Sequence, residues 1–524
     1  MMTRDAAKSR EQIEFLSLEQ LVPKDHLVRK LENAIDWSFI YDLVEEKYSE
    51  NKGRPSLDPV MLIKMPVIQV MFGLRSMRQT TAEIAVNVAY RWFLGLELQD
   101  PTPHFSTFSK NYTRRFKNTD LFEQIFQRIL SECIEAGLVD PSVVFVDSTH
   151  VKARANSKKY ADEIAEEEAK WYAEELWAEI QKDRMAHGKK PLKEQTSAEE
   201  MDDDNDNDND DDNDELPPQN ESSKGKVNKN TSKKKAKRQK KERHIKKSTS
   251  DPESGWFRKG EHKHVFAFSV ETACDRNGIV LGYSVHPGND NDGKTFPALF
   301  EKIKHLPIEI LVGDSAYKTP AIAHLLSTNK MQLLSAYTRP GGKKGFLPKY
   351  AYVYDEYYDC YLCPNNHVLT YHTTNRDGRR EYRSDPQVCM NCPYLAQCTE
   401  SKECQKTVQR HIWEEYVEQV EDLRYHPEMK DLYGLRKETI ERDFAIAKEL
   451  HGFRYTQLFG KARMEMKAAL TYLCLNLKKL AKKRWRTRGK TDFCTAISII
   501  FCALRNIIRK LASGCLPNAS LSTV

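Results

Sequence analysis

The feature that most constrains the fold of this chain occurs twice: a short, mostly apolar run that ends in an aspartate. Residues 143–147 are VVFVD and residues 309–314 are EILVGD. Runs of this length, rich in β-branched residues, predict buried strands. The residues at a strand end can leave the core of a sheet to meet a ligand. A helix N-cap or a turn is the alternative setting for each aspartate alone. Because the arrangement is repeated, we expect Asp147 and Asp314 to belong to one site.

The segments around these strands alternate between strand and helix patterns. Two runs separated by the turn residues CDRN predict a β-hairpin, and the later runs predict helix, strand, helix and strand. In order, these segments are the hairpin at 264–273 and 278–287, the helix at 295–306, the strand at 309–314, the helix at 319–329 and the strand at 331–337. This order predicts an α/β fold with a mixed sheet, and it fits a ribonuclease-H-like core.

The N-terminal part of the chain has a different pattern. Segments such as PVMLIKMPVIQVMFGL and TTAEIAVNVAYRWFLGL carry apolar residues three and four positions apart. This spacing predicts packed helices, so residues 1–135 are expected to form an all-helical domain. Ser106 or Thr107 is the expected N-cap of one further helix. Its basic residues, which could lie against DNA phosphates, are Lys110, Arg114 and Arg115. A solvated basic face is an equally good interpretation of that helix.

A third acidic residue lies in a downstream helix pattern, YGLRKETIERDFAIAKELHGFR. Glu441 has Lys437 four residues before it and Lys448 seven residues after it. In a continuous α-helix, these three side chains project from roughly one face. A carboxylate between cations could bind a metal while the lysines bind phosphate. An ordinary salt-bridged surface is the alternative, and Glu438 is the rival third acid.

The three carboxylates Asp147, Asp314 and Glu441 would suit magnesium, or manganese in its place. Magnesium prefers octahedral oxygen coordination and takes one or two protein carboxylates alongside phosphate oxygens. A pair of such ions can bind the attacking and leaving oxygens of a displacement at phosphorus. The chemistry that this predicts is the cutting and joining of nucleic acid.

Residues 160–193 form a charged tract with a helical pattern, and a low-complexity block follows. The acidic MDDDNDNDNDDDNDE is succeeded by the basic KGKVNKNTSKKKAKRQKKERHIKK. Neither half can bury enough apolar surface to fold alone, so residues 194–250 are predicted to be a disordered insertion. The basic half could contact nucleic acid. A solvated linker is the alternative.

The chain has 12 cysteines, which in a cytosolic protein favour metal binding or free thiols over disulfides. Two CxxC pairs, Cys360 with Cys363 and Cys389 with Cys392, are separated by 25 residues. Each pair can supply two thiolates to a tetrahedral Zn²⁺ site, which predicts a zinc-ribbon-like subdomain. Other residues that could replace one ligand are Cys398, Cys404 and His367. Nearby arginines that could contact DNA, or serve only a structural role, are Arg376, Arg379, Arg380 and Arg383.

These patterns predict five regions in the 524 residues. They are the helical DNA-binding domain at 1–135, the first part of the α/β core at 140–345, the cysteine-rich subdomain at 350–410, the glutamate helix with the end of the core at 411–485, and an amphipathic C-terminal helix and tail at 486–524. The apolar stretch 493–504 is too short to span a bilayer. The polar N-terminus has no signal-sequence pattern, so we expect a cytoplasmic protein with no membrane partner.

The order of motifs resembles the insertion-sequence transposases of the DDE type, in the large bacterial subgroup with a cysteine cluster between the second and third acids. The resemblance covers most of the chain apart from the charged insertion. The motifs that carry it include FLGLELQDPTPHFSTFSK, VFVDSTHVKA, SVHPGNDNDGKTF, VGDSAY, the glutamate helix and ALTYLCLNLKKL. Each motif is modest alone, but their order is specific.

The resemblance implies that Asp147, Asp314 and Glu441 are the catalytic acids and that Lys448 is the lysine that follows the glutamate. The family usually has an arginine four residues before the glutamate. Here that position is Lys437, which helix geometry favours over the displaced Arg436. His286, Asp290 and Asp292 match a recurrent family stretch beside the active site, for which a simple turn is the alternative.

The resemblance also implies a mechanism and partners. Metal-bound water would cleave a phosphodiester at the end of the element, and the freed 3′-hydroxyl would attack target DNA. The partners would be double-stranded DNA, both element ends and target, and a second copy of the chain in a homodimer associated with the nucleoid. A transposase-derived DNA-binding protein without chemistry and a nuclease without strand transfer are the alternatives.

Overall fold

The computed structural model describes residues 15–49, 56–165, 171–193, 243–259, 263–337 and 341–512. The chain divides into two compact units. The larger unit contains residues 1–161, 246–337 and 416–524, and the smaller unit contains residues 162–245 and 338–415. Each unit is described by itself.

The larger unit begins with the expected helices. In order they are α1 (Leu18–Leu21), α2 (Leu27–Glu32), α3 (Phe39–Val44), the short η1 (Glu45–Lys47), α4 (Pro59–Met71), α5 (Met77–Val86), α6 (Val88–Leu94), α7 (Ser106–Asn111), the π-helical η2 (Tyr112–Phe116) and α8 (Leu121–Glu135). Helix α4 is buried over most of its length because its sequence is apolar on nearly every face. The Asp58 side chain caps it by accepting a hydrogen bond from the Val60 N–H at 2.7 Å.

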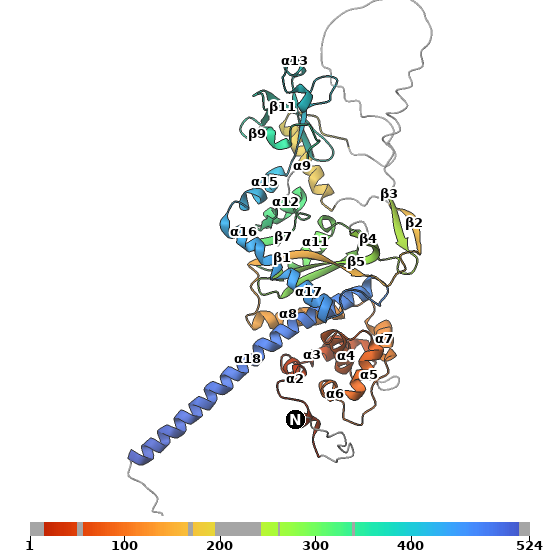
Figure 1. Cartoon of the computed structure of the whole chain (residues 1–524), viewed down its shortest axis with the longest axis vertical. Helices are drawn as coiled ribbons and strands as arrows, with labels where there is room; N and C mark the ends of the chain where they lie inside the picture. The colour runs from red at the N-terminus through yellow and green to blue at the C-terminus, as the bar shows by residue number, and fades with distance from the viewer. Residues whose placement is uncertain are drawn as a thin grey trace, which may run out of the picture. The chain divides into compact units, whose positions relative to one another are not determined.

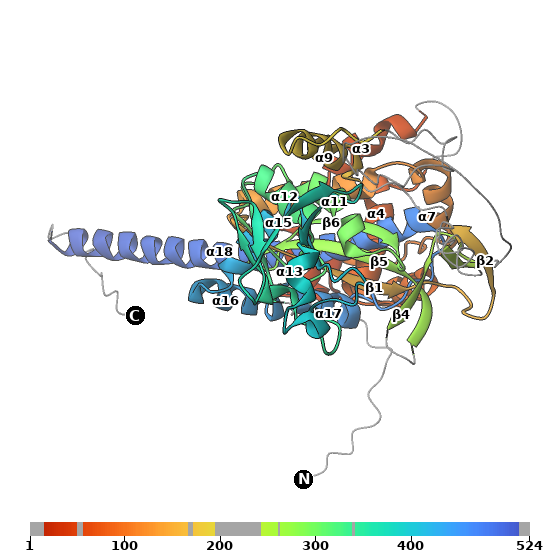
Figure 2. The same ribbon diagram turned by 90° about the horizontal axis from the view of Figure 1, so that it is seen from above.

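A six-stranded mixed sheet follows in the larger unit. Its strands are β1 (Val143–Lys152), β4 (Gly255–Lys259), β5 (Lys263–Asp275), β6 (Val280–Pro287), β7 (Ile310–Gly313) and β8 (Gln332–Ser335). Strands β1, β7 and β8 run parallel, and β5 pairs antiparallel with β1, β4 and β6. Strands β1 and β5 lie side by side in both views (Figure 1, Figure 2). The predicted hairpin is thus confirmed as β5 and β6.

Helices cover both faces of this sheet (Figure 1). Helices α11 (Asp292–Ile303) and α12 (Pro320–Thr328) cover one face, as the sequence predicts for these two segments. Helices α8, α17 (Ile440–Leu450) and α18 (Lys461–Ala512) cover the other. The segment before α17 forms α15 (Glu414–Leu423), α16 (Pro427–Gly434) and the 3₁₀ turn η4 (Leu435–Lys437).

Helix α18 is continuous across the predicted boundary at residue 485. Asn476, which is fully buried, fixes this helix to β6 through both polar atoms of its side chain. Its Oδ1 accepts from the Val280 N–H at 2.9 Å, and its Nδ2 donates to the Val280 carbonyl at 2.8 Å. Arg484 donates to Glu132 of α8 at 2.7 Å. The side chains of residues 489–512 lie outside the described ones, so the expected amphipathic C-terminal face is not addressed.

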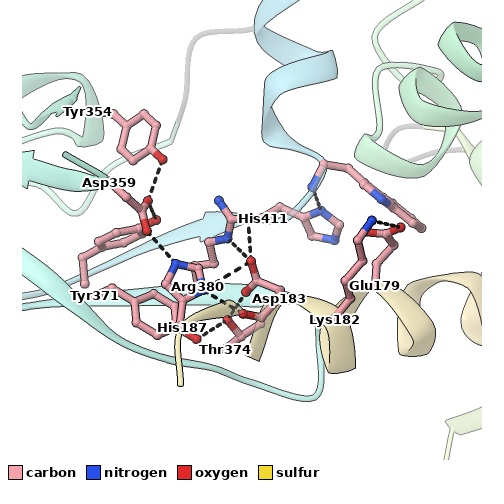
Figure 3. A network of polar contacts seen from close by, with 12 residues as sticks. Glu179, Lys182, Asp183, His187, Tyr354, Asp359, Tyr371, Thr374, Arg380 and His411 are labelled. Atoms are coloured by element: carbon pink, nitrogen blue, oxygen red, sulfur yellow. Dashed lines mark hydrogen bonds and ion pairs between the residues drawn. The ribbon is translucent and has the colours of Figure 1, made fainter. Parts of the chain in front are cut away.

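The smaller unit contains a five-stranded antiparallel sheet in the order β13-β12-β11-β10-β9. Its elements are α9 (Ala173–Ala186), η3 (Lys349–Ala351), β9 (Val353–Asp355), β10 (Cys360–Leu362), β11 (Val368–Thr374), β12 (Arg379–Ser384), α13 (Pro386–Met390), α14 (Leu395–Cys398) and β13 (Thr407–His411). Asp183 of α9 binds Arg380 of β12 at 2.6 Å and accepts from the Thr374 hydroxyl at 2.5 Å (Figure 3).

The tract at 160–193 differs from its prediction. Residues Tyr160–Ala165 form strand β2, which pairs with β3 (Arg243–Ser248), and only Ala173–Ala186 is helical. The local pattern could not predict this strand because its partner lies about eighty residues away. Most of the predicted insertion, residues 194–242, lies outside the described residues. In the part of the chain that the structure describes, no helix is long and apolar enough to cross a membrane.

Candidate active site beside β1 and β7

Asp147 and Asp314 lie at corresponding positions of neighbouring parallel strands. Phe145 of β1 is paired with Val312 of β7, so two residues further along each strand the register brings Asp147 level with Asp314. Gly313 precedes the second aspartate, and a Cβ there would lie 3.0 Å from the ring of the buried Tyr317. The close packing of Tyr317 therefore explains the glycine.

Asp147 is a largely buried carboxylate with one cationic partner. Its side chain is 20% exposed, and the Arg436 guanidinium lies 2.8 Å from Oδ2. The Ser148 N–H donates to Oδ1 at 2.8 Å. Burial raises the pKa of Asp147 to about 6, Arg436 opposes this shift, and the carboxylates of Asp314 and Asp292 add to it.

Asp292 is a third acid at this place. It lies in the first turn of α11, where its Oδ2 accepts from the Ser148 hydroxyl at 3.0 Å. Burial raises the pKa of Asp292, the Ser148 hydrogen bond opposes the shift, and Asp314 raises the pKa further. Asp314 accepts from the Ala316 N–H at 2.8 Å. Three carboxylates therefore gather around Ser148, beside the middle of β1 and the end of β7. The strand predicted to end at Asp147 continues to Lys152, because β1 stays paired with β5 over these residues.

The other residues of the predicted family stretch lie nearby in sequence but have different surroundings. The His286 ring lies 2.9 Å from the Ser284 hydroxyl. Burial lowers the pKa of His286 to about 4, and Lys461 and Lys302 lower it further. This histidine is therefore neutral at pH 7. Asp290 follows Gly288 in the turn between β6 and α11.

Glu441 lies in α17, as the sequence predicts, but its side chain is exposed. The buried residues of the same helix are Ile440, Asp443, Phe444 and Ala447. The structure records no hydrogen bond or ion pair of Glu441 within the described ranges, and the rival Glu438 is exposed as well. Among those residues, no three His, Cys, Asp or Glu side chains are arranged to hold a metal ion together as they stand.

The basic residue beside Asp147 is Arg436, and not the predicted Lys437. Arg436 is 6% exposed and also donates to the Tyr433 hydroxyl at 3.1 Å. Lys437 is exposed and forms no recorded ion pair with a described residue. Lys448 lies in the last turn of α17, where its amine is 6.0 Å from the centre of the Phe444 ring.

The predicted DNA-binding residues lie in α7 and η2. Helix α7 begins at Ser106 with Phe105 as its N-cap residue, so neither Ser106 nor Thr107 is the cap. Lys110 and Arg114 are exposed. The Arg115 guanidinium donates to the Asn111 side chain and lies 4.4 Å from the centre of the Tyr48 ring. Two of the three cations therefore face solvent, while Arg115 also packs within its own unit.

The cysteine cluster of the smaller unit differs from the predicted one. A cavity of about 110 Å³ is lined by Cys363, Cys389, Cys392 and Cys398. Cys360 does not line it. Burial raises the pKa of Cys360, and the carboxylates of Asp355 and Asp359 raise it further. Burial also raises the pKa of Cys389, but the neighbours that raise it further are the thiols Cys398, Cys392 and Cys363.

Local hydrogen bonds orient the thiols around this cavity. The Cys363 sulfur accepts from the His367 N–H at 3.3 Å, in a turn that places Asn366 at a φ of 59°. The Cys392 sulfur accepts from the Asn365 side chain at 3.7 Å. The Cys398 sulfur lies 3.0 Å from the Tyr352 hydroxyl.

Two known families match this chain. Residues 16–114 match the family described as Transposase domain (DUF772), and residues 362–481 match the family described as Transposase DDE domain. No curated protein and no solved structure matched. The two matched segments, in this order, define a transposase. Both matches support an insertion-sequence transposase of the DDE type, as the motifs predict.

Sequence reasoning missed the position of two residues in this site. Helix geometry favours Lys437, but the guanidinium beside Asp147 is that of Arg436. Asp292 was noticed only as part of a recurrent stretch. The available signal was its place two residues after another acid, at the predicted start of a helix.

Proposed function

We propose that this transposase binds the inverted-repeat ends of its insertion sequence and catalyses metal-dependent DNA cleavage and strand transfer, acting as a homodimer. The observation that carries the proposal is the level placement of Asp147 and Asp314 on neighbouring parallel strands, with Asp292 bound to Ser148, the residue after Asp147. Carboxylates gathered in this way repel one another unless a cation compensates them.

We also propose that the core is ribonuclease-H-like. Three parallel strands, β1, β7 and β8, continue into the antiparallel hairpin β5–β6, and helices cover both faces. The first two acids belong to two central parallel strands: Asp147 lies in the middle of β1, and Asp314 directly follows β7. The third acid follows on the later helix α17.

The donor set fits magnesium or manganese, because hard cations prefer carboxylate oxygens. Asp147 and Asp314 would hold the metal, with Glu441 as the proposed third ligand. When bound, the metal supplies an activated water and stabilises negative charge on the phosphate. Because Glu441 is exposed while Asp292 lies with the other two acids, the third ligand is the part of the site that an experiment must decide.

The cations of the site have distinct roles in this proposal. Arg436 compensates the charge of Asp147 and holds that carboxylate in position. Lys448, two helical turns from Glu441, would contact a DNA phosphate. Lys437 is exposed on the preceding turn and would bind DNA more distantly.

A cleavage assay tests the catalytic proposal. Purified protein with magnesium should cleave DNA that carries the element ends and join the freed 3′ end to a target plasmid. Asp147→Asn and Asp314→Asn should reduce cleavage by at least 10³-fold while they leave DNA binding unchanged, because electrostatic stabilisation of this kind is the main catalytic contribution. Full activity of either variant would disprove the assignment.

The same assay identifies the third acid. Glu441→Gln, Asp292→Asn and Glu438→Gln should be compared, with Glu438→Gln as the matched exposed control on the neighbouring turn. Loss of cleavage in Glu441→Gln alone supports the proposed triad. Loss of cleavage in Asp292→Asn alone shows that Asp292, and not Glu441, is the third acid. Cleavage without strand transfer would support a nuclease, and binding without cleavage would support a DNA-binding protein.

We further propose that the smaller unit binds a structural zinc ion through Cys363, Cys389, Cys392 and Cys398. Four thiolates are the usual donor set for such a site, and these four line one cavity. The present side-chain positions do not hold a metal, so small rotations of the thiols would have to close the site. The turn at Asn366 already fixes the direction of Cys363.

Metal analysis separates this ligand set from the one that the sequence predicts. We expect one zinc ion per chain by mass spectrometry of the purified protein. Cys398→Ser should lose the metal, and Cys360→Ser should retain it. If Cys360→Ser loses zinc and Cys398→Ser retains it, the ligands are those that the sequence predicts, with Cys360 in place of Cys398. A wild-type protein without zinc would disprove the proposal.

A further inference from the structure

A cavity of about 420 Å³ lies in the larger unit, away from the carboxylates. Helices α4, α5 and α7 line one part of it, and the end of α17, the loop after it and the start of α18 line the rest. Its volume falls within the range of about 300–1,000 Å³ that is usual for small-ligand sites. It can admit a nucleotide, but not a duplex. We call it the cationic cavity.

The charges around the cationic cavity are almost all positive. Its basic residues are Arg75, Lys448, Arg454, Arg463 and Lys467, and its only acidic residue is Glu449. Glu449 is already bound to Arg454. The Lys467 amine donates to the carbonyls of Gly452 at 2.8 Å and Tyr455 at 2.6 Å, so it stiffens the loop. The remaining guanidinium groups favour an anionic occupant.

The walls of the cationic cavity are aromatic and apolar. Phe105, Phe108 and Tyr112 line the side formed by α7 and η2, and Met466 and Leu470 line the side formed by α18. The Arg463 guanidinium lies 5.8 Å from the centre of the Tyr112 ring. Aromatic side chains beside guanidinium groups match the two parts of a nucleotide, because a base stacks on aromatic rings while its phosphate binds cations.

The cationic cavity also adjoins the catalytic helix. Lys448 and Glu449 belong to the last turn of α17, which carries Glu441. Seven residues of helix separate Glu441 from Lys448, which is about 10 Å along the axis. An occupant would therefore lie one to two nucleotides from the proposed catalytic glutamate. Both matched transposase segments contribute to the lining.

We propose that the cationic cavity holds an unpaired nucleotide of the DNA substrate. The base lies against Phe105 and Phe108, and Arg75 and Arg463 bind its phosphate. This inference rests on the proposed function, since it takes DNA as the substrate. Removing a nucleotide from a duplex costs a few kcal/mol, so the cavity selects DNA ends that are frayed or already single-stranded near the cleavage position.

A binding comparison tests the proposal without metal and therefore without cleavage. The probes are a blunt duplex and the same duplex with two unpaired thymidines at one 3′ end, measured by fluorescence anisotropy. The wild type should bind the overhang at least tenfold more tightly, since base stacking on aromatic rings has about that strength. The double variant Phe105→Ala with Arg463→Ala should lose this preference and keep its affinity for the blunt duplex.

Two further measurements keep the test decisive. Lys117→Ala removes an exposed cation next to η2 that does not line the cavity, and it should retain the preference. In the wild type, 5-iododeoxyuridine in the overhang should cross-link to Phe105, Phe108 or Tyr112 on irradiation, which does not depend on the folding of any variant.

The outcomes distinguish this proposal from the one on which it rests. Equal affinity of the wild type for both probes, or cross-links only outside the cavity, overturns the cavity proposal even if the protein cleaves DNA. Thymidine monophosphate that binds as tightly as the overhang would also overturn it, because the occupant would then be a free nucleotide. A clear overhang preference in a protein that never cleaves DNA supports the cavity and refutes only the transposition chemistry.

Discussion

At the residue scale, Glu271 is the acid whose surroundings are most unusual. It lies on β5, is fully buried, and accepts from the Ser284 hydroxyl at 3.3 Å. Burial raises its pKa from the ordinary 4.5 to about 8, and Asp292 adds to the shift. A carboxyl with such a pKa is mostly protonated at neutral pH and then places no further negative charge beside the carboxylates of the candidate site.

Glu271→Gln should change how stability depends on pH. The folded pKa is raised above the unfolded one, so the stabilisation from this group is fully present below pH 4.5 and is lost as the pH rises through about 8. Glutamine mimics the protonated form and loses nothing. The variant should match the wild type near pH 4.5 and exceed it at pH 9 by on the order of 3–5 kcal/mol.

Urea unfolding of the metal-free protein at several pH values measures this difference. Glu309→Gln, at an exposed glutamate just before β7, is the matched control and should show no pH-dependent gain. A stability difference in Glu271→Gln that stays constant with pH would contradict the prediction.

Arg436, and not Lys437, is the cation that lies beside Asp147. The choice of Lys437 assumed a continuous α-helix from Lys437 to Glu441. The structure instead has a 3₁₀ turn at Leu435–Lys437 and a non-helical Thr439 before α17 begins at Ile440. The side-chain directions at Lys437 and Glu441 therefore cannot be related by the α-helical rotation of about 100° per residue. Within the 3₁₀ turn, Arg436 is the buried residue.

At the element scale, α9 belongs to the same compact unit as the cysteine-rich sheet. Its Asp183 binds Arg380, and its His187 lies 2.8 Å from Asp359, which accepts from the hydroxyls of Tyr354 and Tyr382 (Figure 3). From the sequence alone, Arg380 is a residue that could contact DNA. In the structure, Arg380 instead binds Asp183 and connects α9 to its sheet.

Asp183→Ala should destabilise the smaller unit by about 3 kcal/mol, because it leaves the partly buried Arg380 without its partner. Glu179→Ala on the same helix is the control. Its bridge to Lys182 is 3.9 Å long with both side chains well exposed, so the change should be below about 0.5 kcal/mol. Hydrogen exchange of the α9 amides measures both. Equal protection in the two variants would show that the Asp183 network does not hold the helix.

At the scale of the whole molecule, the larger unit is assembled from three separate stretches of sequence. Helix α18 contacts β6 through Asn476 and α8 through Arg484. The second contact joins Arg484 to Glu132, which are 352 positions apart along the chain. Cys474 and Thr471 are likewise fully buried in this helix. The first part of α18 thus belongs to the core of the unit, whereas its sequence predicted only a helix that ends the core.

The sequence by itself determined the features that depend on short-range patterns. The buried runs before Asp147 and Asp314, the β5–β6 hairpin, the flanking helices and the family all follow from local periodicity and motif order, whereas the continuation of β1 past Asp147 to Lys152 does not. Only the tertiary structure decided which side chains meet: Arg436 beside Asp147, Asp292 beside Ser148, Cys398 with the three other cavity thiols, and α9 with a sheet that begins 180 residues after it starts. The physical reason is that these contacts depend on helix breaks, strand register and pairing between distant segments, which no local window of sequence contains.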